Sequence, residues 1–433
     1  MSCIPSYHIP PNFKDHLLSW IDSFETGVLL DSNTQQGDRP AHSSWDLLAG
    51  VGVKSVLEVH DGLAFEQLKL FQSQNAGKWL FGYFSYDLKN ELEELCSDNF
   101  DGLKWPPMLF FQPEIIVGIK DGRAMIYSDN KDTKTILNDI LNTPIINETK
   151  QYPTIQLQPR ISKQTYLQTI NTIKNHIKRG DIYELNYCQE FYAHPSSLQP
   201  TELFKRLNKI AKAPFSGYLK QLDKTLLCAS PERFLKKSGQ QLISQPIKGT
   251  RRRDADLGKD AHIRTELVNN PKDRSENIMI VDLVRNDFAK NCIPGTVKVD
   301  ELCQIYSFPT VHQMISTVSG TLPKGTNSID AIKDAFPMGS MTGAPKVMAM
   351  KLIEAYEETK RGLYSGALGY FDPNGDFDFN VVIRSLQYNS TENYLSCSVG
   401  GAIVYESDPA QEYEECLIKM AAIQSALSNN IPV

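Results

Sequence analysis

Three segments of the chain combine helical spacing of apolar residues with signals for helix ends. From Ser162, apolar side chains recur at helical spacing until Gly180, a residue type that commonly ends helices. Asp408 and Pro409 favour the N-cap and the first helical position, and a second pattern follows them to about residue 427. A third helix is expected from Asn270 to about Lys290. The pattern therefore predicts helices near 162–180, 270–290 and 408–427.

Elsewhere the apolar residues form short runs or alternate with polar residues, as they do in strands. Such runs occupy residues 27–32, 115–119, 181–187, 241–244, 364–371, 379–387 and 394–404. Strands and helices show no regular βαβ order, so the sequence predicts an α+β fold with antiparallel sheets. Glu184 and Asn186 share one face of their strand, which is compatible with a polar cavity or with the solvated face of an edge strand.

The composition changes along the chain and suggests three regions. Residues 129–160 are rich in Asn, Thr, Lys and Pro and poor in aromatic residues. We interpret this stretch as a link, which gives an N-terminal region at 1–130, a linker at 131–160 and a catalytic region at 161–428.

Bulk properties narrow the class of protein. The 433 residues are 41% hydrophobic and 22% charged with a net charge of −6, which is typical of a soluble globular protein and argues against nucleic acid as the main partner. No apolar stretch has membrane-spanning length, and the N-terminus does not resemble a signal peptide, so we expect no membrane partner and a cytoplasmic location. The eight scattered cysteines predict free thiols, because they form no metal-binding or disulfide pattern.

A basic segment at residues 245–253 is the first candidate for chemistry. Before Lys248, Pro246 restricts the backbone, and after it Gly249 has no side chain. Thr250 and three arginines follow Gly249 directly. Such a segment is either a solvated turn or a pocket for an anion. Other motifs decide between the two.

Eight motifs in order resemble the chorismate-utilising enzymes, a family that includes anthranilate, aminodeoxychorismate, isochorismate and salicylate synthases. They lie at residues 180–183, 230–234, 246–251, 272–277, 343–346, 364–367, 383–385 and 412–419. The resemblance implies a large α/β sandwich of two antiparallel sheets with helices outside, and dependence on Mg²⁺. It also implies that the substrate is chorismate, a small dicarboxylate.

The resemblance assigns a role to each candidate site residue. Glu232 would be the general acid for the departing hydroxyl group, with a salt bridge to Arg233 as the structural alternative. The implied metal ligands are Glu276, Glu412 and Glu415, and the implied substrate contacts are Gly249, Thr250, Tyr364, Arg384, Gly400, Gly401 and Lys419. The metal would bind the ring carboxylate, and the two glycines would offer backbone N–H groups to an anion.

Two positions distinguish the members of the family. Isochorismate and salicylate synthases carry a lysine at the position of Glu184, so a carboxylate there argues against their chemistry. The segment from Pro246 to Thr250, with Lys248 at its centre, resembles the matching segment of aminodeoxychorismate synthase component I. In that enzyme the lysine adds to C2 of chorismate before ammonia substitutes at C4. An amine nucleophile must be neutral, so we expect burial or a cation such as Arg251 to lower the pKa of Lys248, whereas acidic neighbours would raise it. The implied activity is Mg²⁺-dependent amination of chorismate to 4-amino-4-deoxychorismate, the precursor of 4-aminobenzoate for folate.

Ammonia would come from a separate glutamine amidotransferase subunit, because the chain has no cysteine nucleophile elbow. The alternatives are anthranilate synthase component I and a non-catalytic chorismate-binding subunit. The sequence departs from the family at Glu184, Gln313 and Ala402, where glutamine, histidine and glycine are usual. In the N-terminal region, residues 29–32 resemble an element of a tryptophan pocket, although a plain buried strand is the better interpretation.

Overall fold

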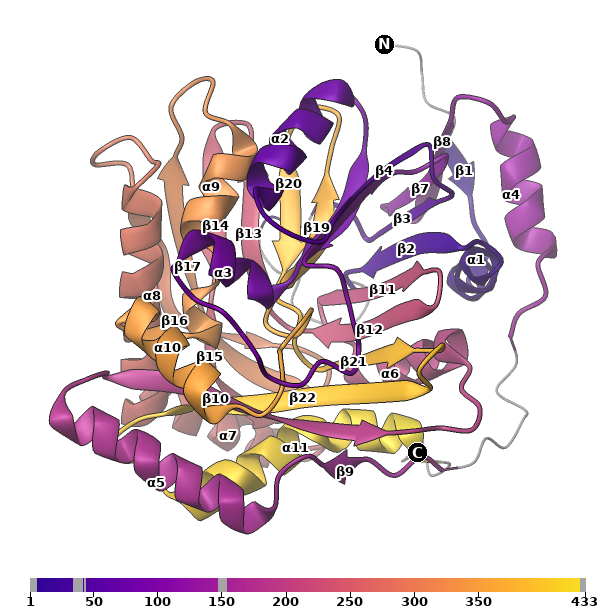
Figure 1. The fold of residues 1–433 in the computed structure, drawn as a ribbon. Coiled ribbons are helices and arrows are strands. Elements are labelled where there is room, and N and C mark those ends of the chain that lie inside the picture. The colour runs from indigo at the N-terminus through magenta and orange to yellow at the C-terminus, as the bar shows by residue number, and fades with distance from the viewer. Residues whose placement is uncertain (1–5, 34–41, 43, 147–153, 429–433) are drawn as a thin grey trace.

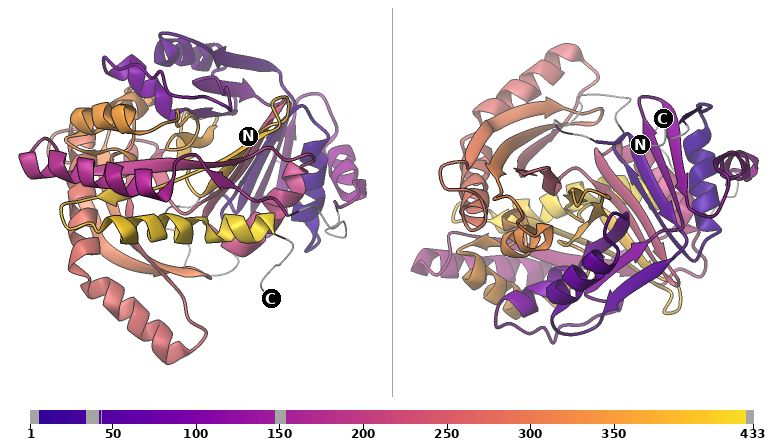
Figure 2. Two further views of the ribbon diagram at one scale, coloured as in Figure 1. Left: turned by 60° about the horizontal axis from the view of Figure 1, so that its bottom comes forward. Right: turned by 90° about the horizontal axis from the view of Figure 1, so that it is seen from above.

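The computed structural model describes residues 6–33, 42, 44–146 and 154–428. In this part of the chain two large antiparallel sheets form a sandwich, and most helices lie outside it (Figures 1 and 2). The predicted α+β sandwich is confirmed.

The first sheet contains twelve strands. In spatial order they are β1 (Ser6–His8), β8 (Arg123–Ser128), β7 (Ile115–Lys120), β3 (Leu47–Val51), β2 (Thr26–Asp31), β11 (Phe215–Gln221), β12 (Lys224–Ser230), β21 (Ser385–Asn389), β22 (Tyr394–Ile403), β10 (Glu184–Ala193) and β18 (Gly343–Ala344), with β9 (Gln158–Pro159) paired to β10.

The second sheet contains ten strands. Their order is β15 (Ile247–Arg252), β17 (Val311–Thr321), β14 (Gln241–Gln245), β13 (Arg233–Ser238), β20 (Phe377–Asn380), β19 (Ala367–Phe371), β5 (Leu80–Phe84), β6 (Met108–Gln112) and β4 (Ser55–Val59), with β16 (Lys298–Ser307) paired to β17.

The helices pack on the outer faces of both sheets. They are α1 (Phe13–Asp22), α2 (Ala64–Gln74), α3 (Lys89–Leu92), α4 (Thr133–Asn142), α5 (Lys163–Arg179), α6 (Pro200–Ala211), α7 (Leu257–Asn269), α8 (Pro271–Ala289), α9 (Ser328–Ala335), α10 (Lys346–Tyr356) and α11 (Pro409–Leu427), with the short helices η1 (Tyr86–Leu88) and η2 (Gly339–Met341). Figure 2 shows α5 and α11 together on one side of the molecule, where their buried residues join the core beneath the first sheet.

Apolar side chains from both sheets form the middle of the sandwich. Val28 and Leu219 of the first sheet belong to the same buried cluster as Phe81 and Leu368 of the second. The sheets approach closely at Gly217, where an added Cβ would lie 2.5 Å from the Leu368 side chain. Glycine at this position therefore allows the two layers to pack against each other.

The three predicted helices are confirmed. Ser162 caps α5 by accepting a hydrogen bond from the Thr165 backbone N–H at 3.0 Å, and Gly180 ends the helix with φ of 85°. Asp408 caps α11 in the same way through Gln411. The third corresponds to α8. Within the described residues, no helix has both the length and the apolar character required to cross a membrane.

The strand predicted over 379–387 is wrong, because two strands of different sheets occupy this range. β20 ends at Asn380 and β21 begins at Ser385, and the chain crosses between the sheets in the residues between them. Arg384 turns the backbone at this crossing with φ of 52°. The strand predicted at 181–187 begins later, at Glu184, and Glu184 and Asn186 are both buried, which excludes the solvated-face interpretation.

The predicted N-terminal and catalytic regions both contribute strands to the two sheets. Strand β2 pairs with β11, and β5 pairs with β19, so strands from before residue 130 and after residue 160 share both sheets. The segment interpreted as a linker contains α4, which packs on α1 and β8. The seven cysteines in the described ranges are free thiols, as predicted.

Candidate active site

A cavity of about 1520 Å³ lies at one end of the sandwich, between β15, β22, α8 and α11. Of the predicted site residues, those on its wall are Glu232, Lys248, Gly249, Thr250, Glu276, Tyr364, Arg384, Gly400, Glu415 and Lys419. Gly401 and Glu412 lie next to it: an added Cβ on Gly401 would be 3.3 Å from Glu412 Oε2 and 3.4 Å from Lys419 Nζ. The fold therefore gathers residues that are spread over nearly 190 positions of the sequence.

Local backbone geometry presents Lys248 to this cavity. Strand β14 ends at Gln245, and after Pro246 the chain enters β15, which pairs with β17. The pairing shifts register between Ile247 and Thr250, and Gly249 within the shift has φ of 89°. A β-bulge of this kind redirects side chains next to a site. An added Cβ at 249 would also lie 3.0 Å from Asp273 and Leu267, so glycine is required for α7 and α8 to pack here.

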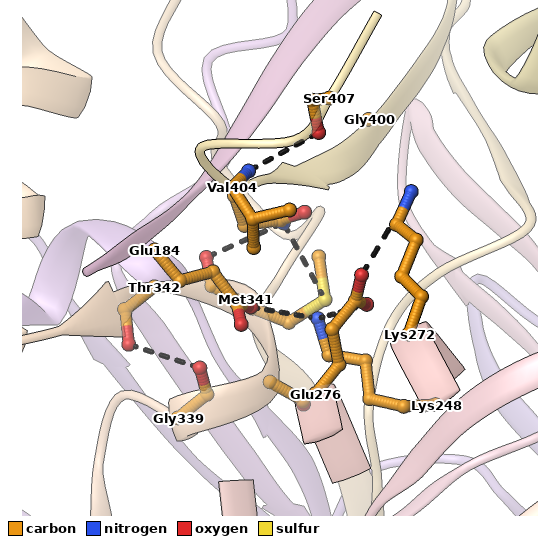
Figure 3. A network of polar contacts seen from close by, with 12 residues as sticks. Glu184, Lys248, Lys272, Glu276, Gly339, Met341, Thr342, Gly400, Val404 and Ser407 are labelled. Atoms are coloured by element: carbon orange, nitrogen blue, oxygen red, sulfur yellow. Dashed lines mark hydrogen bonds and ion pairs between the residues drawn. The ribbon is translucent and has the colours of Figure 1, made fainter. Parts of the chain in front are cut away.

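Lys248 is surrounded by carboxylates. Its Nζ donates a hydrogen bond to Glu184 Oε1 at 2.8 Å and lies 3.9 Å from Glu276 Oε2 (Figure 3). Burial opposes the charged amine, but these carboxylates outweigh it and raise the pKa of Lys248. The expectation of a lowered pKa is therefore wrong for this structure. Arg251 does not supply the expected cationic contact, because its guanidinium pairs with Asp273 at 2.8 Å.

Glu232 lies where the chain passes from the first sheet to the second, between β12 and β13. Its Oε1 accepts a hydrogen bond from the Ser340 hydroxyl at 2.7 Å. Burial is the main cause that raises the pKa of Glu232 to about 7, a value suited to a general acid. The alternative of a salt bridge to Arg233 does not hold, because Arg233 pairs with Asp378 at 2.9 Å.

Two lysines hold the three predicted metal carboxylates. Lys272 Nζ lies 3.3 Å from Glu412 Oε1 and 3.9 Å from Glu276 Oε1, so these two carboxylates already share one cation. Lys419 pairs with Glu415 at 2.7 Å. In the part of the chain that the structure describes, no three His, Cys, Asp or Glu side chains form a group that could hold a metal ion. The carboxylate oxygens are donors that suit Mg²⁺, and Lys272 places a cation between Glu276 and Glu412. A site formed by all three carboxylates would require them to move. The metal ligands therefore stay a prediction.

The predicted substrate contacts form a connected group. Lys419 Nζ donates to the Gly400 carbonyl oxygen at 2.7 Å, and the Arg384 guanidinium donates to the Lys419 carbonyl oxygen at 3.3 Å. The hydroxyl of the buried Tyr364 accepts from the Cys188 thiol at 3.6 Å. Gly400 also has a packing role, since an added Cβ would overlap Cys188 Sγ. These contacts to chorismate remain predictions.

Three neighbours of the site were not predicted from the sequence. Ser340 holds Glu232, and the buried Arg361 donates to the carbonyl oxygens of Met341 and Asn186 on the cavity wall. Glu357 in turn holds the Arg361 guanidinium at 2.7 Å. Glu357 and Arg361 are four residues apart but follow the end of α10 at Tyr356, so no helical pattern in the sequence indicates this buried pair. Gln313, identified as a departure from the family, lines the cavity, and its buried Oε1 has no hydrogen-bond partner within the described residues.

Comparison with known proteins gives the family. A sequence profile described as chorismate binding enzyme matches residues 27–425. Aminodeoxychorismate synthase component 1 of Escherichia coli is 34% identical over 355 residues, covering 80% of this chain and 76% of that protein. Anthranilate synthase component 1 of Saccharolobus solfataricus is 33% identical over 348 residues, covering 80% of each. The crystal structure of anthranilate synthase component I from Streptococcus pneumoniae superposes with a TM-score of 0.77 at 22% identity, covering 90% of this chain and 94% of that chain. The chain belongs to the family of chorismate-binding enzymes.

Proposed function

We propose that this chain aminates chorismate at C4 with ammonia, giving 4-amino-4-deoxychorismate, the precursor of 4-aminobenzoate for folate. One observation carries the proposal: Lys248 and the buried acid Glu232 line the same cavity. A nucleophilic amine and a carboxylic acid are the two groups that this substitution requires. The relatives named aminodeoxychorismate synthase component 1 support it.

Each group has a defined part in the reaction. The Lys248 amine adds to C2 of chorismate while hydroxide leaves C4 and takes the proton of Glu232. Ammonia then attacks C4, and the bond between C2 and Lys248 breaks. Lys248 must first lose a proton, and Glu184 Oε1 at 2.8 Å is the nearest acceptor. The other oxygen of Glu184 is buried and has no hydrogen-bond partner within the described residues, so the carboxylate has an unused acceptor.

The cationic side chains of the cavity suit a dicarboxylate substrate. Arg384 and Lys419 are the proposed partners of the chorismate carboxylates. Glu276, Glu412 and Glu415 are the proposed Mg²⁺ ligands, after release from Lys272 and Lys419. When bound, the metal would supply positive charge for one substrate carboxylate.

Ammonia comes, in this proposal, from a glutamine amidotransferase subunit in the cytoplasm. The names of several relatives contain "component 1", which is in keeping with a second component. Anthranilate synthesis is the second candidate, because anthranilate synthase component 1 of S. solfataricus is about as similar to this chain as the aminodeoxychorismate synthases are.

Product analysis tests the proposal. The purified chain, supplied with chorismate, Mg²⁺ and an ammonium salt, should form a product that keeps the enolpyruvyl group, and glutamine should not replace the ammonium salt. Anthranilate and pyruvate as products would support the second candidate. No turnover of chorismate with the ammonium salt would contradict both.

A further inference from the structure

A second, much smaller cavity lies behind Glu232. Its volume is about 20 Å³, and Glu232 and Ser340 line both this cavity and the large one. The remaining wall comes from α8, from β13 and β14, and from the end of α9 with the segment that enters η2. It is mostly apolar, as at Val284, Phe288 and Ala335, and it also includes Arg233 and Asp287. The two cavities therefore meet at the general acid, and the small one extends from it toward α8.

The size and lining of this cavity select its occupant. A water-sized molecule needs about 10–15 Å³, so the cavity has room for one such molecule. Its mostly apolar wall disfavours an ion, because an unpaired buried charge is costly. Two charged residues also lie on the wall, and both are paired: Asp287 with Lys346 at 2.7 Å and Lys290 at 3.2 Å, and Arg233 with Asp378 at 2.9 Å. Water and ammonia, two small neutral molecules that donate and accept hydrogen bonds, both meet these conditions, and the chemistry of the proposed reaction favours ammonia.

The proton balance of the proposed reaction also closes most directly when ammonia lies beside Glu232. When the C4 hydroxyl leaves as water, the O–H bond of the Glu232 carboxyl group breaks and a carboxylate remains. Attack by ammonia forms the C4–N bond and leaves a positive charge on nitrogen. Transfer of one proton from this nitrogen to Glu232 gives the neutral amine and restores the acid. Chorismate and ammonia thus become 4-amino-4-deoxychorismate and water, with no other reactant.

We propose that the small cavity behind Glu232 is the ammonia-binding site, so that ammonia reaches C4 from the α8 side while chorismate occupies the large cavity. This inference rests on the proposed function. In this proposal, the packing of α8, α9 and Ser340 around the small cavity determines which nucleophile reaches C4.

Filling the cavity tests the proposal. Val284→Leu adds one carbon atom and Ala335→Val adds two at the wall of the small cavity. Val281→Leu and Ala331→Val make the same changes on the same two helices at buried positions that do not line it, and they serve as matched controls. Steady-state kinetics with an ammonium salt should show an increase of about tenfold or more in the KM for ammonia in the first pair, with an unchanged KM for chorismate. The controls should retain wild-type values.

Two outcomes would overturn the ammonia site. One is a wild-type KM for ammonia in both cavity-filling variants when their melting temperatures show a folded protein. The other is an equal increase in the cavity variants and the controls, which would attribute the effect to helix packing. Failure of the proposed function is a different result, since the wild-type chain would then form no C4-aminated product.

Discussion

The protonation of Lys248 is the main question at the scale of single residues. Its amine is held by Glu184 and Glu276, and both carboxylates favour the charged form. A charged amine cannot form a bond to C2, so the proposed covalent role requires transfer of this proton when chorismate binds. A lysine that acts only as a charge would need no such step, and the two roles give different results on substitution.

Replacement of Lys248 separates the two roles. If it forms a bond to C2, Lys248→Ala should slow amination by roughly two orders of magnitude or more. Lys248→Arg keeps the positive charge but provides no usable neutral amine, so it should be as slow as Lys248→Ala. Rapid-quench kinetics and mass spectrometry of the wild type should show a chorismate adduct on the peptide that contains Lys248. High activity of the arginine variant without an adduct would leave the lysine a purely electrostatic role.

Glu232 predicts a dependence of the rate on pH. Its pKa of about 7 means that the acid is protonated below this pH and loses its proton above it, so kcat should fall as the pH rises through about 7. The hydrogen bond from Ser340 favours the carboxylate and lowers this pKa. Ser340→Ala should therefore move the decrease to higher pH. The profile must be measured at a constant concentration of free ammonia, which itself increases with pH.

A chemically similar pair supplies the control for this shift. Ser396 donates to the buried Glu190 at 2.7 Å, and neither residue lines the active-site cavity. Ser396→Ala should leave the pH profile unchanged. If Ser340→Ala also has the wild-type profile, Glu232 is not the group that limits the rate.

At the scale of helices and strands, the predicted metal site depends on the positions of α8 and α11. Glu276 lies near the start of α8, whereas Glu412 and Glu415 lie in the first two turns of α11. Lys272, one turn before Glu276, spans the two helices by contacting Glu276 and Glu412. The two helices thus provide the predicted carboxylate ligands, and Lys272 would have to withdraw for a metal to bind between them.

Removal of carboxylates tests this arrangement. Glu276→Gln and Glu415→Gln should abolish Mg²⁺-dependent turnover and keep the fold, because each loses a charge and a ligand. Glu412→Gln should have a milder effect if this residue reaches the metal through water. Glu414→Gln is the control: this exposed residue of the same helix also lines the cavity, but its carboxylate is paired with Lys163 at 2.7 Å and contacts none of the predicted metal ligands. Wild-type activity at limiting Mg²⁺ in the first two variants would contradict the assignment.

The same site should bind metal more weakly in acid. Burial raises the pKa of Glu276 to about 7, and a carboxylate ligand must be deprotonated. Protons therefore compete with Mg²⁺, and the apparent Kd should increase as the pH falls below about 7. Titration calorimetry in buffers of different ionisation enthalpy should detect the released proton. Affinity that is independent of pH between 6 and 8 would exclude Glu276 as a ligand.

Some elements were predictable because their signals are local. The cap residues and apolar spacing of α5 and α11 lie within the helices themselves. The crossing between β20 and β21 was missed because pairing with distant strands, not local pattern, ends β20 at Asn380. In the site, motifs identified Lys248 and Glu232, whereas Ser340 was missed because 108 positions separate it from Glu232 and only the fold brings them together.

At the scale of the whole molecule, both sheets depend on the N-terminal region. Strand β2 covers the edge of β11 in the first sheet, and β5 covers the edge of β19 in the second. The apolar middle of the sandwich likewise contains residues such as Phe81 and Leu368 from both regions. The catalytic region is thus packed as one body with the strands that precede it.

A fragment of residues 154–428 should therefore not fold alone. It would expose two strand edges and part of the apolar middle of the sandwich, and exposed edges of this kind favour aggregation. Thermal unfolding followed by circular dichroism should show no cooperative transition for the fragment, in contrast to the full chain. A cooperative transition together with chorismate turnover would show instead that residues 161–428 are an independent domain.

The pairing of β5 with β19 also has a consequence for synthesis on the ribosome. Phe84 lies opposite Ala367, so β5 is complete 283 positions before its neighbour begins. At typical elongation rates of about 5–20 residues per second, this interval lasts roughly 15 s to a minute. During that time the strand has no partner on one side, and neither sheet can close. The nascent chain must remain protected from premature association for most of its translation, and early termination should produce aggregates.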